Sequence, residues 1–384
     1  MPEAPRRVLH VMRMRGVSGA ENHLFELTRS LRNEGWYSDV LIPAPVPSRL
    51  APFARRLSSA CERVDVVSMR TDISPTLVLR LARLLRSGRY DIAHAHMVHA
   101  DWYLAAASVV ARSVPLVSSK HNPDAFRKLA PFRIVERAFL RRYSAVIAIS
   151  EDLREFTERS TGVKTVTVHY GLSPSDEPIR PRARTNHAPR LLAVGRLEKQ
   201  KGFEVAIEAM KLVKAAVPGA QLLIAGDGQQ RSMLAERVEA LGLDNTVSLL
   251  GNRDDVEELM RGADLLVHHA RWEGFGLVLI EAMRAHLPIV ASRVSAIPEV
   301  VADGESGLLV PPDDPQALAG AIIELLGDST RRQAMGSAGF KRLRDEFSTE
   351  KMARGVANVY ASVLGDKRSE RRAFLSRWPT HPLA

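Results

Sequence analysis

Short apolar runs alternate with helical patterns of apolar and polar positions along most of the chain. The first run, Val8–Met12, has the length of a buried strand, and a glycine-bearing loop, Gly16–Gly19, follows it. Ser18 and Glu21 have the spacing of a capping box, which predicts that a helix begins there and ends before Gly35. The chain is therefore expected to open with a strand, a loop and a helix.

The same alternation predicts the other elements of the first half. Further strands are expected at Ser38–Ile42, Asp91–Ala95, Pro115–Ser119, Ala145–Ile149 and Val166–His169. Helical patterns separate most of these strands, at Thr76–Arg86, Asp101–Arg112 and Ile134–Arg142. Repeated strand–helix units of this kind indicate a parallel sheet with helices on both faces.

Proline and polar residues interrupt the alternation near the middle of the chain. Residues 173–189 hold four prolines among polar and charged side chains, which is the composition of a linker. The alternation then resumes, with strands expected at Leu191–Val194, Gln221–Ala225, Thr246–Leu249, Asp264–His268, Ile289–Ala291 and Leu308–Val310. Helices are expected at Phe203–Ala216, Arg231–Leu241, Val256–Arg261, Leu277–Ala285, Pro315–Leu326, Thr330–Phe347 and Thr349–Leu364.

These elements predict an α/β chain with two Rossmann-like, doubly wound domains that face a central cleft. The expected domains are residues 1–172 and 190–348, joined by the linker 173–189 and followed by a last helix and a basic tail over 349–384. The length of 384 residues agrees, because one hydrophobic core rarely serves so long a chain. Ligands bind such sheets at the carboxyl ends of strands, so the loops that leave strands carry the candidate chemistry.

The composition excludes several classes of protein. No apolar run approaches the roughly 18 residues of a membrane span, and Arg13 and Arg15 break the stretch that would form a secretory signal. The single Cys61 excludes an internal disulfide and a cysteine-based metal cluster. We therefore expect a cytoplasmic protein, either free or peripheral at the inner face of the cell membrane.

The net charge of +10 is distributed unevenly. Residues 1–185 carry +11, residues 186–350 carry −6, and residues 351–384 carry +5. Two interpretations remain open: the basic first half binds an anionic surface or partner, or an arginine-rich composition merely covers solvated helix faces. The acidic second half and the lack of aromatic stacking motifs argue against a nucleic-acid partner.

The most informative segment is Arg271–Met283, which holds two carboxylates with seven residues between them. Glu273 stands in a loop with two glycines, and Glu281 stands in an apolar run that predicts a helix. Such a loop before a helix N-terminus allows the backbone to approach an anion closely. Carboxylates at this place accept hydrogen bonds from sugar hydroxyls, so the segment predicts a nucleotide-sugar site.

Other strand-end loops add candidates for the same site. Arg196 and Lys201 precede a predicted helix, and two cations at a helix start suit a diphosphate. They could also stabilise a departing nucleotide diphosphate; the alternative is that both are solvated loop cations. Gly19 lies in the first glycine loop, His121 follows another strand, and Arg253 stands where a nucleotide base could bind.

Histidines cluster at two predicted strand ends, His94-x-His96-x-x-His99 and the pair His268–His269. A metal site is conceivable, but no acidic or cysteine ligand stands nearby in the sequence, so polar cleft lining is the preferred interpretation. The chain also lacks an Asp-x-Asp pair, which argues against a metal-held diphosphate. We expect no metal and no cofactor.

Residues 126–142 alternate basic and apolar side chains. A basic amphipathic segment can lie on an anionic membrane, but an ordinary surface helix that packs on a sheet has the same pattern. The basic tail, residues 367–377, favours the membrane interpretation slightly.

Together these residues resemble the retaining family 4 glycosyltransferases of the GT-B fold, also called glycosyl transferases group 1. The stretch from Glu273 to Glu281 is similar to the Glu-x7-Glu motif of that family. The resemblance covers nearly the whole chain. It extends to the loop before Glu21, Ser150-Glu151, Gly195-Arg196, Lys201-Gly202, Gly226-Asp227-Gly228 and the stretch from Pro298 to Val310.

The resemblance implies a role for each matching residue. Arg196 and Lys201 would bind the donor diphosphate, and Glu281 would bond the ribose hydroxyls. Glu273 would face the donor sugar as the catalytic carboxylate, with His121 beside the transferred sugar. The donor site would also include Gly19, Arg253 and the backbone of Phe275, Gly276 and Leu277. The last helix would cross back to the first domain.

Two positions depart from the family pattern. Ser18-Gly19 stands where the family has paired glycines, which puts phosphate contact there in doubt, and Tyr170-Gly171 stands where the family has Asn-Gly. The role of that second turn is open for the same reason.

The resemblance implies a metal-independent, retaining enzyme that moves a hexose from a UDP- or GDP-sugar to an acceptor hydroxyl. The acceptor would be a glycan or a lipid-linked glycan in cell-surface polysaccharide or glycolipid synthesis. Two alternatives stay open: a nucleotide-sugar epimerase of the same architecture, which would consume donor without an acceptor, and a non-catalytic nucleotide-sugar-binding partner subunit.

Overall fold

The protein forms two compact units in the computed structural model, which describes residues 5–69, 71–111, 114–123, 130–174 and 188–375, without the side chains of 130–132 and 366–375. One unit comprises Met1–His169 and Thr349–Ala384, and the other comprises Tyr170–Ser348. Most of the predicted linker, the segment 126–129 and the end of the basic tail lie outside the described residues.

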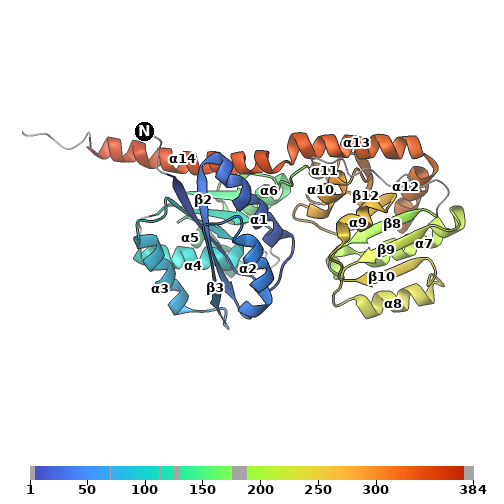
Figure 1. Ribbon diagram of the computed structural model, residues 1–384, viewed down its shortest axis with the longest axis horizontal. Helices are drawn as coiled ribbons and strands as arrows, with labels where there is room; N and C mark the ends of the chain where they lie inside the picture. The colour runs from blue at the N-terminus through green and yellow to red at the C-terminus, as the bar shows by residue number, and fades with distance from the viewer. Residues whose placement is uncertain (1–4, 70, 112–113, 124–129, 175–187, 376–384) are drawn as a thin grey trace, which may run out of the picture. The chain divides into compact units, whose positions relative to one another are not determined.

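The first unit is built on a seven-stranded parallel sheet, in the order β3-β2-β1-β4-β5-β6-β7. Figure 1 labels two of its strands, β2 and β3. The strands are β1 (Arg6–Met12), β2 (Trp36–Ala44), β3 (Arg63–Ser68), β4 (Ile92–His96), β5 (Leu116–Lys120), β6 (Ala145–Ala148) and β7 (Val166–Thr167). The helices are α1 (Gly19–Leu31), α2 (Ala51–Leu57), α3 (Pro75–Arg86), α4 (Met97–Val110), α5 (Ala130–Leu140), α6 (Glu151–Thr161) and α14 (Thr349–Leu375).

Successive residues of the central strands face opposite sides of this sheet, as a strand requires. Leu9 and Ala93 face a core shared with α3 and α4. Val8 and Ile92 face the other core, which α1 and α14 complete. Tyr360 of α14 is fully buried in that second core. The last helix therefore packs on the first unit, as expected.

The second unit holds a six-stranded parallel sheet, in the order β10-β9-β8-β11-β12-β13. Its strands are β8 (Arg190–Val194), β9 (Gln221–Ala225), β10 (Val247–Gly251), β11 (Leu265–His268), β12 (Ile289–Ser292) and β13 (Gly307–Val310). Its helices are α7 (Phe203–Ala216), α8 (Arg231–Ala240), α9 (Val256–Arg261), α10 (Leu277–Arg284), α11 (Ile297–Val300), α12 (Pro315–Gly327) and α13 (Ser329–Glu346).

The prediction of two doubly wound α/β sheets is confirmed, but several elements were missing or misplaced. The hydrophobic pattern did not predict β3, whose residues are mostly half-buried at the edge of the sheet, nor the short helices α2 and α11. It also did not predict α6. Helix α4 begins at Met97, directly after β4, instead of at Asp101. Helix α14 continues to Leu375 instead of ending at Leu364.

Each sheet has one point where the strand order reverses direction. These points lie between β1 and β4 in the first unit and between β8 and β11 in the second. Ligands of doubly wound sheets bind outside the carboxyl ends of the strands at such a point. The loops after these four strands are therefore the places where a site is expected.

Close packing of α13 against the residues that follow α10 leaves no room for a side chain at one glycine of α13. A Cβ atom at Gly336 would lie 2.0 Å from the backbone oxygen of His286. We predict that Gly336→Ala destabilises the second unit by about 1–3 kcal/mol, because the helices must separate. Thermal unfolding measures the loss.

Gly320, inside α12, is the matched control, because nothing lies within 4 Å of a Cβ added there. Gly320→Ala should stabilise the protein by about 0.5–1 kcal/mol, since alanine is the better helix former. Equal melting temperatures for the two variants would contradict the packing argument.

Candidate functional site

An ion pair joins the two loops at the reversal point of the second sheet. Lys201, from the loop after β8, donates from Nζ to Oε2 of Glu273, from the loop after β11. His268 Nε2 lies 3.3 Å from the same carboxylate oxygen. The side chains of Lys201 and Glu273 are only 16% and 11% exposed, so water screens the pair weakly.

The neighbours of Glu273 decide its protonation state. Burial alone would raise the pKa of this carboxyl group, but the charge of Lys201 and the close approach of the His268 ring outweigh it and lower the pKa to about 2. Burial lowers the pKa of His268 below its ordinary value. Near neutral pH, the site therefore holds a fixed carboxylate, a fixed ammonium group and a neutral imidazole.

The two loops are also joined through their backbones. His269 Nδ1 donates a hydrogen bond of 2.6 Å to the backbone oxygen of Lys201. Gly202 has a φ of +62°, and a Cβ atom there would lie 2.6 Å from the backbone oxygen of His269. A glycine is required at this contact on both grounds. His268 and His269 thus support Glu273 and Lys201, instead of simply lining a cleft.

Arg271 provides a third connection, which the sequence analysis did not assign. Its backbone nitrogen donates to the oxygen of Gln200 at 2.8 Å, and its guanidinium group donates to the oxygen of Lys199, also at 2.8 Å. The guanidinium group pairs with Glu204 as well, at 2.7 Å. These bonds hold the loop after β8 against the loop that carries Glu273.

The turn before α10 has the backbone geometry that its glycine predicts. Gly276 has a φ of +87°, and a Cβ atom there would lie 2.8 Å from Leu279 Cδ1 and 3.3 Å from Glu273 Cγ. The α10 helix then begins at Leu277. The ring of Phe275 is buried and packs edge-to-face on Tyr170 and Phe347, so the ring is not accessible to a ligand.

Glu281 lies on α10 and is half-buried. Burial raises the pKa of its carboxyl group, and the positive charge of Arg284 opposes this only in part. In the parts of the chain that the structure describes, no group donates a hydrogen bond to this carboxylate. Its bonding capacity is therefore available to a ligand.

Two predicted donor-binding cations have other partners. Arg196 is exposed and bonds Glu198 at 3.0 Å. Arg253 donates two hydrogen bonds to the carboxylate of Asp255, at 2.7 and 2.5 Å. Among the described residues, neither contacts the Lys201–Glu273 pair. The structure thus brings together Lys201 and Glu273 and leaves Arg196 and Arg253 on exposed loops.

In the first unit, the predicted site residues stand at the ends of β1 and β5. Gly19 is exposed at the first turn of α1, and Ser18 donates from its backbone and hydroxyl to Glu21 at 2.8 and 2.6 Å, as the capping box predicted. His121 follows β5 directly and is 4% exposed.

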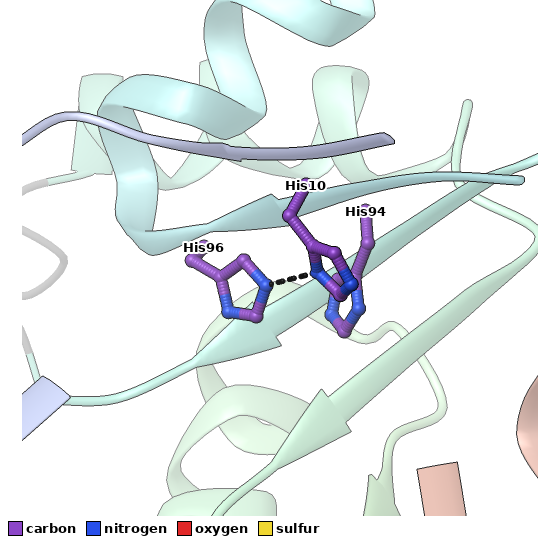
Figure 2. Close-up of side chains that lie close together, drawn as sticks. All are labelled: His10, His94 and His96. Atoms are coloured by element: carbon purple, nitrogen blue, oxygen red, sulfur yellow. Dashed lines mark hydrogen bonds between the residues drawn. The ribbon is translucent and has the colours of Figure 1, made fainter. Parts of the chain in front are cut away.

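The sequence grouped the histidines of this unit wrongly. His99 lies on α4, beside Trp102, because the helix begins directly after β4. The third member of the cluster is His10 of β1, which is paired in register with His94. Figure 2 shows the rings of His10, His94 and His96 gathered together, with ring nitrogens within 4.8 Å of one another.

A buried charge cluster lies next to His121. Lys120, fully buried, donates to Asp101 of α4 at 2.5 Å and to Glu136 of α5 at 3.2 Å. The sequence pattern does not reveal this cluster, because the three residues come from a strand and two helices. Burial, together with the charge of Lys120, lowers the pKa of His121 to about 3, so the ring is neutral.

The same cluster bears on the basic segment 126–142. Glu136 anchors α5 to the sheet through Lys120. Arg133 donates to the backbone oxygen of Ser160 at 3.2 Å. The guanidinium group of Arg137 lies beside Gly162, 3.7 Å from the place where a Cβ atom would stand if this residue had one. Both cations thus meet the carboxyl end of α6, where a helix dipole favours positive charge. Among the described helices, none is long and apolar enough to cross a membrane.

Known proteins with the same architecture define the class. HepE of Anabaena, solved with UDP and glucose, superposes with a TM-score of 0.79 at 23% identity, covering 93% of this chain and 100% of that one. Sucrose-phosphate synthase of Thermosynechococcus elongatus gives a TM-score of 0.73 at 22% identity, covering 94% and 100%. The fold is the GT-B fold of glycosyltransferases.

Sequence comparison identifies the family. The profile described as Glycosyltransferase Family 4 matches residues 17–175, and the profile described as Glycosyl transferases group 1 matches residues 176–342. Glycogen synthase of Mycobacterium tuberculosis is 32% identical, with 93% of each chain covered. Phosphatidyl-myo-inositol mannosyltransferase of Mycobacterium leprae is 30% identical, covering 90% of this chain and 93% of its own length. The chain belongs to the family 4 glycosyltransferases, enzymes that use nucleotide sugars.

If the ion pair sets the charge of Glu273, removing Lys201 should reverse the direction in which stability changes with pH. In the wild type, the lowered pKa of Glu273 stabilises the folded state above the group's ordinary pKa of 4.5. This stabilisation is lost as the pH falls toward 2. Lys201→Met leaves a buried carboxylate that must share a proton with His268. The variant should be about 3–5 kcal/mol less stable than the wild type at pH 8. It should regain stability as the pH falls to 6, because the folded state then binds more protons than the unfolded state.

Lys199→Met is the matched control, because Lys199 stands two residues away with an exposed side chain. Its stability should follow that of the wild type at every pH, as measured by urea unfolding. A Lys201→Met protein with the wild-type pH profile would show that the pair does not set the charge of Glu273.

Proposed function

We propose that the protein is a metal-independent, retaining hexosyltransferase. It transfers a hexose from a UDP- or GDP-sugar to an acceptor hydroxyl in the synthesis of a cell-surface polysaccharide or glycolipid. The observation that carries the proposal is the buried Lys201–Glu273 pair, held at the reversal point of the second sheet. The carboxylate of Glu281, which accepts no hydrogen bond from the described residues, follows it on α10.

The charges of this site fit a nucleotide diphosphate sugar. Lys201 and Arg196 supply the positive charge for the diphosphate, as charge-assisted donors do at phosphate sites. Glu281 accepts hydrogen bonds from the ribose hydroxyls. The backbone N–H groups at the start of α10, from Gly276 and Leu277, stand at a helix N-terminus, which favours an anion. Arg253 completes the donor site of the second unit, the family resemblance is the ground for proposing a role for Gly19, and the reaction needs no metal ion.

Glu273 orients the donor and does not attack it. Its low pKa keeps it ionised, and its contact with Lys201 fixes the carboxylate. The acceptor oxygen attacks the anomeric carbon from the face that the diphosphate leaves, and the departing phosphate accepts the proton of the acceptor hydroxyl. Lys201 stabilises the negative charge that develops on the leaving group. For His121, the family resemblance is the ground for proposing a role in the transfer.

The relatives support the donor and the kind of acceptor. HepE was solved with UDP and glucose, which favours UDP-glucose as the first donor to test. The relatives named glycogen synthase and phosphatidyl-myo-inositol mannosyltransferase favour a glycan or a lipid as acceptor. The basic first unit holds that acceptor.

The donor site predicts distinct effects for its two carboxylates. In a thermal-shift panel of UDP-, GDP- and ADP-sugars, one donor should stabilise the wild type markedly. Glu281→Gln should weaken the binding of that donor about tenfold, because a charged acceptor of hydrogen bonds is lost. Glu273→Gln should lower kcat about 100-fold. NMR of the product reports whether the anomeric configuration is retained, and EDTA should leave the rate unchanged.

Glu258→Gln is the matched control, because Glu258 is exposed on α9; it should change neither donor binding nor kcat. Consumption of the donor without an acceptor product would indicate an epimerase instead. Binding without any turnover would indicate a non-catalytic partner subunit.

Peripheral membrane binding is part of the proposal, through α5. Ile134 and Val135 on this helix are 71% and 44% exposed, and Arg141 and Arg142 stand exposed just after it. Exposed apolar side chains beside cations suit an anionic lipid surface. The protein would lie at the inner face of the cell membrane.

Vesicle sedimentation tests this part. The protein should bind phosphatidylglycerol vesicles at low salt, bind phosphatidylcholine vesicles weakly, and dissociate as salt screens the charges. Ile134→Asn should weaken binding about tenfold, because a buried isoleucine contributes at least 1.4 kcal/mol. Ile73→Asn changes an isoleucine that is 83% exposed elsewhere in the unit and should have no effect. Equal binding of all three proteins, or none, would contradict the proposal.

A further inference from the structure

A buried arginine lies at the point where the strand order of the first sheet reverses. Arg13 directly follows β1 and continues the alternation that places Leu9 and Val11 in the core below α3 and α4. Its side chain is only 7% exposed. Ligands of doubly wound sheets bind at such a reversal point, so a cation buried here is a candidate for ligand binding.

Most of the guanidinium group of Arg13 has no partner. Nη2 contacts the carboxylate of Asp72, which lies in the loop before α3. Nε and Nη1 are buried, and neither has a hydrogen-bond partner among the described residues. Buried donors without partners destabilise a fold. The burial of this group therefore needs an explanation other than the stability of the fold.

The contact with Asp72 is a weak reason for burying the charge of Arg13. The side chain of Asp72 is 61% exposed, so water competes for its carboxylate. Lys120, a buried cation of the same unit, contacts the carboxylates of Asp101 and Glu136, which are themselves buried. A buried cation with a structural role is neutralised in that way, and Arg13 is not.

Three further groups surround the contact between Arg13 and Asp72. Arg15, whose side chain is 71% exposed, lies 3.8 Å from the Asp72 carboxylate. The hydroxyl of Tyr103 on α4 donates to the backbone oxygen of Asp72 at 2.7 Å. His99 stands one turn before Tyr103 on the same helix. Burial and the charge of Arg13 lower the pKa of His99 below its ordinary value, so its neutral ring lies close to that charge.

The N-terminus of α4 adds to the positive potential at this place. The helix has 14 residues, its N-cap residue His96 makes no side-chain capping bond, and its first turn holds no acidic residue. The backbone N–H groups of such a first turn attract anions. Arg13 and Arg15 add two positive charges, and Asp72 neutralises only one of them.

We propose that Arg13 and Arg15, beside the N-terminus of α4, bind a phosphate group, and that the Asp72 carboxylate occupies their site in the unliganded protein. Asp72 supplies one negative charge and meets one of the three guanidinium nitrogens of Arg13. A phosphate monoester carries about two negative charges at neutral pH, which balances both arginines. When it displaces the Asp72 side chain, it can also bond two nitrogens of Arg13 at once.

In the proposed hexosyltransferase, this phosphate belongs to the acceptor. That step rests on the proposed function, in which the first unit holds the acceptor. The acceptor is then a phosphorylated molecule, either a soluble sugar phosphate or a phospholipid headgroup, and the two arginines select it against neutral sugars. The phosphate site itself lies entirely within the first unit and does not depend on that step.

Isothermal titration calorimetry with inorganic phosphate, at constant ionic strength, tests the site. The wild type should bind phosphate. Arg13→Met should weaken this binding about tenfold or more, because charge-assisted hydrogen bonds are lost. Asp72→Asn should tighten it about fivefold, because the competing group loses its charge.

Arg83→Met is the matched control, because Arg83 is exposed on α3 and should not affect phosphate binding. Equal phosphate affinity in the wild type, Arg13→Met and Asp72→Asn would place any bound phosphate elsewhere and overturn the proposal. A purely structural ion pair would lower the melting temperature of Asp72→Asn without tightening its phosphate binding. That result would also overturn the proposal, even if Arg13→Met folds poorly.

Phosphatidate vesicles distinguish the two sources of phosphate. Weaker sedimentation of Arg13→Met than of the wild type with these vesicles would identify a lipid headgroup. Equal sedimentation, together with competition by glucose 6-phosphate but not by glucose in the titration, would identify a soluble sugar phosphate. Acetate that binds the wild type as tightly as phosphate would show a carboxylate site and contradict the proposal.

The transfer assay separates this inference from the proposed function. With the donor selected by the thermal-shift panel, inorganic phosphate should compete with the acceptor in the wild type and inhibit Arg13→Met about tenfold less. Equal inhibition of both proteins would contradict the acceptor step. A panel in which no nucleotide sugar binds would contradict the proposed function, while the phosphate titration would still decide the site.

Discussion

The ion pair between Lys201 and Glu273 is the interaction on which the second unit's candidate site depends. It joins loops that are about 70 residues apart in the chain, and it is almost closed to water. Buried pairs contribute little net stability, but losing one partner is costly because the other charge stays buried. The backbone contacts of His269 and Arg271 hold the geometry that makes the pair favourable. The main effect of the pair is thus to hold the ammonium group of Lys201 and the carboxylate of Glu273 in fixed positions. Its contribution to the stability of the fold is the smaller effect.

In the proposed donor site, this arrangement couples ligand binding to the loop. A diphosphate that attracts Lys201 also weakens the hold on Glu273, and the carboxylate then needs a new partner. Hydroxyls of a sugar can provide it, because they donate to a carboxylate as an ammonium group does. A nucleotide without its sugar would leave Glu273 unpaired in a dry site.

Much of the fold could be predicted from the sequence, because buried parallel strands are short apolar runs. The strand Gln221–Ala225 and the helix Phe203–Ala216 were placed to the residue. The edge strand β3 was missed, since Arg63 and Asp65 interrupt its valines and its residues are mostly half-buried. The spacing of Glu273 and Glu281, and Lys201 with its following glycine, pointed to the site because those signals are local.

The rest of the site depends on contacts that sequence spacing does not reveal. Arg271 donates a hydrogen bond to the backbone of a loop that precedes it by about 70 residues. Lys120 is neutralised by carboxylates from two different helices. His10 joins His94 and His96 only because parallel strands pair in register. A hydrophobic pattern shows which residues are buried, but it does not show which polar groups meet inside.

The position of Tyr360 has a consequence for the order of synthesis. This residue fills the core beside Trp36 and bonds His94, yet the ribosome adds it only after the whole second unit has been made. The first unit therefore emerges with one face of its sheet covered only in part, by α1, and it must wait for its last helix while the second unit is complete enough to fold. In the growing chain, the domain that is made first is the last to be finished, which exposes apolar surface to chaperones during translation.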